Sequence, residues 1–252
     1  MVPTRLSLVT YNLWLTERWP ARAPALEKFL KLFSPDVLCV QELQLPTQEF
    51  IDGILTEHDR VRDPFPGWTN ESNIYWNKAI FESVEYGAED VGHPEPLRRM
   101  FWVRLRLKGL PRTIFVSTAH LTSPRNQDEG ASGLSPRIRQ LKRIAEELAR
   151  LVRDAEPAFF MGDMNDAWHP QRILGQTGFV SCFAALGLQS PPTFQCYPTA
   201  NVQPGAPTVT EAIDIIVANR HARAVAADVP QCYGENGAPS DHWPVHAVYQ
   251  LL

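Results

Sequence analysis

Six short segments place a carboxylate, an amide or a histidine at the edge of an apolar run. In chain order they are Thr10-Tyr11-Asn12, Gln41-Glu42, Thr118-Ala119-His120-Leu121, Gly162-Asp163-Met164-Asn165, Ile213-Asp214-Ile215-Ile216 and Ser240-Asp241-His242. Polar side chains in such places are costly to bury alone. Glu42 and Asp214 each follow several apolar residues directly, so each would be an unpaired buried charge without a partner or a metal. The residue types are therefore those of acid–base or metal-assisted chemistry.

Each of these residues also has an ordinary structural interpretation. Asp163 alone could cap a helix, Asn12 could form a turn, and Asp241 could form a cap after Ser240. Any one motif is a weak signal. Six in order along the chain favour a functional site over six unrelated turns and caps.

With these spacings the sequence resembles the endonuclease/exonuclease/phosphatase superfamily, the metal-dependent phosphohydrolases that include deoxyribonuclease I, abasic-site endonucleases and neutral sphingomyelinases. The resemblance runs from Asn12 to His242 and so covers nearly the whole chain. It implies a four-layer α/β sandwich, in which two packed mixed β-sheets are flanked by helices. It also implies one catalytic domain over residues 1–252, with the site at the top of the two sheets.

The resemblance further implies a cofactor, Mg²⁺ or Mn²⁺. Glu42 would be the main metal ligand, with Asn12 and Asp241 contributing oxygens directly or through water, which suits a hard cation that keeps several waters. Such an ion would polarise a phosphoryl oxygen and offset charge on the leaving group.

The same resemblance implies the catalytic roles. His242 would contact the phosphate, and Asp214 would accept a hydrogen bond from its other ring nitrogen. Asp163 would orient or deprotonate the attacking water, while Asn165 and His120 would donate hydrogen bonds to the phosphoryl oxygens. The sequence leaves open whether Asp163 or His242 acts as the base.

Two further segments are candidates for contact with substrate. The polar loop 122–136 directly follows the His120 strand and offers Arg125, although a solvated connector is an equally good interpretation of any one of its residues. The segment 68–78 mixes aromatic and amide groups, from which Tyr75 and Asn77 are predicted to bind substrate. Core packing is the better interpretation for at least one of the two tryptophans in it.

Within the superfamily the motifs look most like the branch that contains the 5′-tyrosyl-DNA phosphodiesterases. Met164 departs from that branch, which has Thr there, and Pro192-Thr193-Phe194 replaces a Trp-Asp-Thr stretch. Inositol-polyphosphate phosphatases match less well, because their Pro-x-Trp-x-Asp-Arg box is missing around Asp214.

The elements that must position these residues are short strands with a few helices between them. Nine apolar runs predict strands: 6–13, 36–41, 74–81, 101–107, 113–121, 158–161, 213–218, 221–228 and 245–251. Helical periodicity is clearest over 137–154, and shorter amphipathic helices are predicted over 23–33 and after Pro46. Many strands with interspersed helices favour two packed sheets covered by helices.

Composition sets limits on other classes of protein. Among 252 residues the formal net charge is −4 and only four are cysteine, so neither a basic nucleic-acid clamp nor a disulfide scaffold is indicated. The four acidic residues assigned to the site equal that excess, so the charge does not exclude a nucleic acid. No P-loop, dinucleotide-binding or nucleophile-elbow motif is present. Zinc at His242 and His246 is disfavoured because Pro244 lies between them.

These observations predict a hydrolase of phosphate esters, most of all a phosphodiesterase of the nuclease type. The alternatives are a phosphatase, a sphingomyelinase-like lipid or sugar phosphoesterase with the same core, and a non-catalytic module that binds phospho-ligands. The expected partner is the phosphoester substrate, with nucleic acid as a candidate. We expect a monomer located in the cytoplasm, without an export signal or a membrane span.

Overall fold

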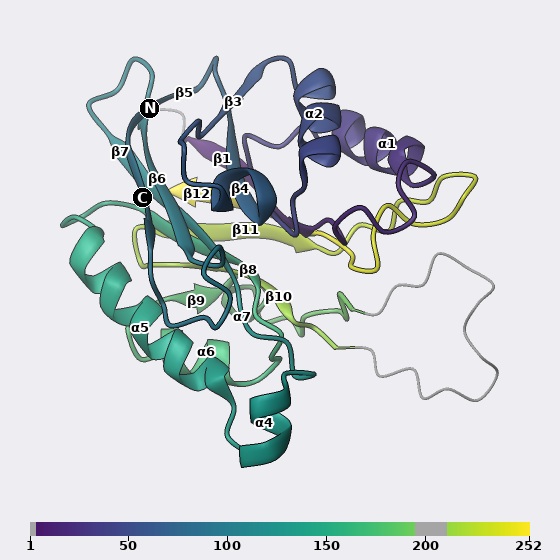
Figure 1. The fold of residues 1–252 in the computed structure, drawn as a ribbon. Coiled ribbons are helices and arrows are strands. Elements are labelled where there is room, and N and C mark those ends of the chain that lie inside the picture. The colour runs from purple at the N-terminus through teal and green to yellow at the C-terminus, as the bar shows by residue number, and fades with distance from the viewer. Residues whose placement is uncertain (1–3, 195–210) are drawn as a thin grey trace.

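The computed structural model describes residues 4–194 and 211–252, and in them twelve strands form two six-stranded mixed sheets (Figure 1). The first sheet has the order β11-β12-β1-β2-β4-β3 and the second β5-β6-β7-β8-β10-β9. The strands of the first sheet are β1 (Arg5–Asn12), β2 (Val37–Gln41), β3 (His58–Arg60), β4 (Ser72–Asn77), β11 (Ala222–Asp228) and β12 (Val245–Leu251). Those of the second are β5 (Phe81–Glu89), β6 (Met100–Leu107), β7 (Thr113–His120), β8 (Ala158–Asp163), β9 (Val180–Ser181) and β10 (Asp214–Ala218).

Longer helices cover the outer faces of the sheets, and shorter ones lie in the connections. The helices are α1 (Ala23–Phe33), α2 (Leu45–Ile54), α3 (Gly67–Asn70), α4 (Gln127–Ser132), α5 (Pro136–Leu151), α6 (His169–Gly175) and α7 (Cys182–Ala185). In Figure 1, α1 and α2 lie on one side of the paired sheets and α5 and α6 on the other. The predicted four-layer α/β sandwich is therefore confirmed.

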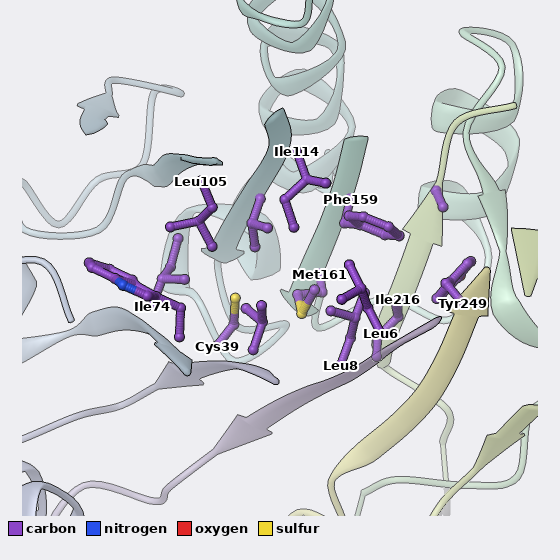
Figure 2. Close-up of a cluster of buried hydrophobic side chains, with 14 of the residues drawn as sticks. Leu6, Leu8, Cys39, Ile74, Leu105, Ile114, Phe159, Met161, Ile216 and Tyr249 are labelled. Carbon is purple, nitrogen blue, oxygen red and sulfur yellow. The ribbon is translucent and has the colours of Figure 1, made fainter. Parts of the chain in front are cut away.

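Alternating side chains explain the three apolar layers. On β1, Leu6 and Leu8 face the space between the sheets, where they meet Met161 and Ile216 of the opposite sheet (Figure 2). Val9 points to the outer face of the first sheet, where it belongs to a second cluster formed with α1 and α2. A third cluster joins α5 to the outer face of the second sheet. This period of two is the pattern expected for strands buried on both faces.

The ends of six strands lie along one edge of the two sheets, which we call the top edge. The carboxyl ends of β1 and β2 meet the amino end of β4 there, because Gln41 pairs with Ser72. In the other sheet the ends of β7 and β8 meet the start of β10, where Asp214 pairs with Asp163. Gln41 joins the sheets, its Nε2 donating to Thr118 Oγ1 at 2.9 Å. Six chain segments distant in sequence thus converge at this edge.

Each of the nine predicted strands overlaps an observed one, and the helices over 23–33 and 137–154 and after Pro46 are present. The missed strands are short or exposed. β5 carries only one buried side chain, Phe81, so it has no apolar pattern to detect. Within the described residues no helix is long and apolar enough to cross a membrane.

Candidate active site

Asp163 occupies the centre of the top edge, at the carboxyl end of β8. Its side chain is 1% exposed. Asn12 Nδ2 donates a hydrogen bond of 2.9 Å to Asp163 Oδ2, and the backbone N–H of Asn165 donates one of 2.8 Å to Oδ1. Gly162 allows β8 to approach β7 this closely: its φ is +146°, and a Cβ there would lie 2.1 Å from the carbonyl oxygen of Ala119. The glycine before the aspartate is thus a steric requirement.

Two imidazoles face the same oxygen of Asp163 from opposite flanks. His242 Nε2 lies 3.7 Å from Asp163 Oδ2 and His120 Nε2 lies 3.4 Å from it. Each ring is turned by a buried carboxylate on its Nδ1: Asp214 Oδ2 at 2.8 Å for His242, and Glu71 Oε1 at 3.0 Å for His120. The site therefore holds two histidine–carboxylate pairs around one aspartate.

Burial alone would lower the pKa of His242, but Asp214, Asp163 and Asp241 outweigh it and raise that pKa to about 10. The pKa of His120 is also raised; burial and Arg98 lower it, and Asp163 and Glu71 overcome them. The pKa of about 10 keeps the His242 ring protonated at neutral pH, and the shift at His120 is in the same direction. Imidazole N–H donors beside a carboxylate can hold a phosphate while the carboxylate faces the attacking water.

Arg98 lies beside His120, just before β6 begins. Its NH1 is 3.2 Å from His120 Nε2, and its Nε is 3.2 Å from Glu71 Oε2. The guanidinium is mostly buried, with 14% of the side chain exposed. This flank of Asp163 thus carries a guanidinium beside the imidazole ring.

Glu42 and Asp241 are the carboxylates of the site that reach solvent, with 19% and 17% of their side chains exposed. Glu42 has a φ of +54°, a left-handed conformation that costs a non-glycine residue about 1–3 kcal/mol and clusters at functional sites. Burial, with the nearby charges of Glu42 and Asp163, raises the pKa of Asp241 to about 6. This crowding of negative charge fits a divalent cation, which would offset it.

A purely geometric cluster of possible metal ligands comprises Asp163, Asp214 and His242. Those three already engage one another or Asn12 through hydrogen bonds and are 5% exposed or less. Glu42 and Asp241 are more open and less occupied, so we favour them as ligands. Asn12 bonds to Asp163 through Nδ2, and its Oδ1 accepts from the backbone N–H of Trp14 at 2.9 Å.

Arg22 holds together the loops that carry Asn12 and Asp241. It is 2% exposed and donates to the carbonyl oxygens of Pro239 and Glu17, among others. Ser240 adds a direct link, since its Oγ donates to the carbonyl oxygen of Asn12 at 2.7 Å. Hydrogen bonds from the buried Arg22 and from Ser240 therefore fix the two candidate metal-binding loops relative to each other.

Comparison with known proteins shows the family of the chain. A model of the family described as Endonuclease/Exonuclease/phosphatase matches residues 9–242. The chain belongs to this family. Its members are phosphoester hydrolases, so the protein is an enzyme of that class.

Solved structures of the family have the same fold at low sequence identity. The D. rerio TDP2 structure complexed with single strand DNA product is 19% identical, covers 98% of this chain and 99% of its own, and has a TM-score of 0.77. An endonuclease/exonuclease/phosphatase family protein from Bacteroides thetaiotaomicron is 17% identical over 100% of both chains, with a TM-score of 0.78. A mannosyl-6-phosphatase from the same organism is 17% identical, covers 97% and 99%, and has a TM-score of 0.74. No curated protein sequence matches the chain.

All eight residues predicted to act in catalysis or metal binding lie together at the top edge. Seven of them are placed by the hydrogen bonds and distances above, and Asn165 completes the set. Its Nδ2 donates to the carbonyl oxygen of Leu121 at 3.0 Å, so the amide braces Asp163 between β7 and β8. Direct contact of Asn165 with phosphate stays a prediction.

Two of the three predicted substrate-binding residues lie elsewhere, which corrects those predictions. Tyr75 is 1% exposed and packs on the outer face of its sheet beneath α1 and α2. Asn77 ends β4 at the opposite edge from the site, because β4 runs antiparallel to β2. The Tyr75 ring packs in the core, and the Asn77 side chain accepts a hydrogen bond from the backbone N–H of Ala79 in the turn after β4. Arg125 is exposed in the loop after β7, and its contact with substrate stays a prediction.

Sequence reasoning missed Glu71 and Arg98. Both precede strands that run antiparallel to a site strand: Glu71 comes just before β4, and Arg98 two residues before β6. The starts of such strands lie at the same edge as the ends of their partners. A search for polar residues before apolar runs, as well as after them, could have found both.

Proposed function

We propose that the chain is a Mg²⁺- or Mn²⁺-dependent phosphodiesterase of the nuclease type. The observation that carries this proposal is the convergence of Asn12, His120 and His242 on one oxygen of Asp163. A buried carboxylate between an imidazolium, His242, and a second histidine ring suits in-line attack of water on a phosphodiester, whose charge the flanking groups offset.

In this proposal Asp163 is the base. His242 already carries its proton at neutral pH and so cannot take another from water. Asp163 takes the proton as the water oxygen bonds to phosphorus and the bond to the leaving oxygen breaks. His242 and His120 donate hydrogen bonds to the phosphoryl oxygens, held in place by Asp214 and Glu71.

Glu42 and Asp241 would hold the metal ion, with Asn12 as an additional oxygen ligand. When bound, such an ion polarises a phosphoryl oxygen and offsets charge on the leaving group. The residues of the chain then need only orient the phosphate and the attacking water.

The test compares a chromogenic diester, bis(4-nitrophenyl) phosphate, with the monoester 4-nitrophenyl phosphate, each with Mg²⁺, Mn²⁺ or excess chelator. We expect metal-dependent hydrolysis of the diester, and Glu42→Gln to weaken Mn²⁺ binding measured by calorimetry. Hydrolysis of the monoester alone would favour a phosphatase. Tight metal-dependent binding of phosphoesters without turnover would favour a binding module. Glu27→Gln, on the outer face of α1, is the matched control.

The substrate, the single domain over 1–252, the monomeric state and the cytoplasmic location stay predictions. A nucleic acid is the substrate we favour among phosphodiesters, and the D. rerio TDP2 complex with single strand DNA is compatible with that choice.

A further inference from the structure

A pocket of about 620 Å³ lies beside the active site, between the segment before β6, α4 and the start of α5. Its lining combines an apolar part with two cations. The residues that matter are the apolar Pro94, Leu134, Pro136 and Ile138 and the cationic Arg139 and Lys142. None of these residues belongs to the catalytic set.

Short chain segments connect the pocket to the His120 flank of the site. Pro94 is four residues from Arg98, so their Cα atoms are at most about 14 Å apart. Arg137 also links the two places: its NH1 donates to the carbonyl oxygen of Thr122, two residues after His120, and to Glu129 beside the pocket. The pocket therefore adjoins the flank of the active site that carries His120 and Arg98, where a phosphate would be held.

Charge indicates which ligand the pocket would accept. Arg139 and Lys142 are three residues apart on α5, so they share one side of the helix. Neither has an ion-pair partner within the described part of the chain, whereas Arg150 of the same helix pairs with Glu147 and Glu89. The carboxylate of Glu129 is already engaged by Arg137 at 2.6 Å. Two uncompensated cations favour a phosphate and disfavour a cationic headgroup such as choline.

The apolar lining indicates that the ligand is more than an inorganic anion. Leu134 is 75% exposed, and together with Ile138 and the two prolines it offers apolar surface in the same pocket as the cations. A nucleobase can pack on such a surface while its phosphate binds the cations. Single-strand recognition commonly combines these two interactions.

We propose that this pocket is a subsite for a nucleotide that neighbours the scissile phosphodiester, so that the preferred substrate is a single-stranded oligonucleotide. This rests on the proposed phosphodiesterase function. The subsite adds binding energy that a small diester cannot use, because such a diester fills only the catalytic site.

The test uses the double variant Arg139→Ala/Lys142→Ala with two substrates, hexathymidylate and bis(4-nitrophenyl) phosphate. We expect kcat/KM for hexathymidylate to fall about tenfold or more, and that for the small diester to stay unchanged. The matched control, Arg5→Ala/Lys78→Ala, removes the same two residue types at the opposite edge of the first sheet and should leave both rates unchanged. Equal losses on both substrates, or no loss on either, would overturn the subsite.

Two further measurements separate the subsite from the function. Fluorescence anisotropy in the metal-free protein measures how the association constant for hexathymidylate falls with salt. In the double variant, the slope of log K against log[salt] should be smaller in magnitude by about 1.4. Leu134→Ser should weaken binding, while Leu188→Ser, at another exposed leucine, should not. Hydrolysis of sphingomyelin vesicles but not of hexathymidylate would refute the subsite and leave the phosphodiesterase intact. Failure on every diester would refute the function itself.

Discussion

The two histidine–carboxylate pairs that flank Asp163 are alike in geometry and different in surroundings. His242 and His120 are 5% and 4% exposed, and each turns Nδ1 to a buried carboxylate and Nε2 to Asp163. Asp214 holds one ring from the start of β10, and Glu71 holds the other from just before β4. The same device is thus built twice from unrelated segments.

The difference lies in one further neighbour. Each ring has a candidate metal ligand nearby: Asp241 Oδ1 lies 4.0 Å from His242 Nε2, and Glu42 Oε1 lies 3.8 Å from His120 Nε2. His120 has in addition the guanidinium of Arg98, at 3.2 Å. We infer that this added positive charge favours the substrate phosphate on the His120 flank.

The largest effect should come from Asp163, which both flanks share. Asp163→Asn keeps the shape but removes the base, so we expect kcat for the diester to fall by about 10²- to 10⁴-fold. Steady-state rates in saturating Mn²⁺ measure this. Asp228→Asn, at an exposed pair with His246, is the control and should be silent. More than a tenth of wild-type activity in Asp163→Asn would exclude the assigned base.

A smaller effect should separate the two carboxylates that orient the rings. Asp214→Asn should lower kcat by about 100-fold, because Asp214 holds Nδ1 of the His242 ring and is the carboxylate that raises its pKa most. Glu71→Gln should cost only about tenfold, since Arg98 still supplies a cation to that flank. Both variants are isosteric, and circular dichroism checks their folding. Equal losses would mean that the two flanks are equivalent.

Arg98→Gln should change the titration of His120 more than the rate. Arg98 lowers the pKa of His120, so its removal should move that pKa upward, while kcat falls by about tenfold or less. The His120 titration can be followed by NMR in the metal-free protein. Arg99→Gln, whose guanidinium lies over the Phe65 ring, should leave it in place. A downward shift in Arg98→Gln would contradict the balance of charges assigned to this flank.

The smallest effect concerns stability and comes from His93, which is buried beside the Arg98 flank. Burial, followed by Arg98 and His120, lowers its pKa from 6.5 to about 4, and its Nδ1 accepts a hydrogen bond from the N–H of Glu95. Folding therefore favours the neutral ring. This stability is complete above pH 6.5 and is lost as pH falls toward 4, by at most about 3 kcal/mol.

Urea unfolding at pH 7.0 and 4.5 tests this for wild type, His93→Gln and the control His221→Gln. The loss of unfolding free energy on acidification should be smaller in His93→Gln than in the other two. An unchanged loss in His93→Gln would show that the ring does not couple to this pH range.

The sequence predicted one flank of the site more fully than the other, for a physical reason. Asp214 and His242 lie in local motifs that a linear scan recognises, whereas Glu71 pairs with His120 across 49 residues. Its position depends on the antiparallel run of β4, which only the sheet order reveals. The pairing of β4 also explains why Tyr75 and Asn77 are not in the site. Tyr75 points to the core because side chains alternate along the strand, and Asn77 lies at the far edge because β4 runs antiparallel to β2.

The fold itself was predictable because its central strands are apolar on both faces. β5 and the short strands β3 and β9 lie near the sheet edges and carry few apolar residues, so tertiary pairing alone places them. The short helices α3, α4, α6 and α7 span four to seven residues, too few for a helical period to show in the sequence.

The mechanism depends most on two roles: Asp163 is the base, and His242 is an imidazolium that holds the phosphate. The most direct measurement is the ¹⁵N chemical shifts of the His242 ring in the metal-free protein at pH 8. The mechanism predicts that both ring nitrogens are protonated, in line with a pKa raised to about 10. An unprotonated Nε2 at that pH would contradict it, because His242 would then be free to act as the base in place of Asp163.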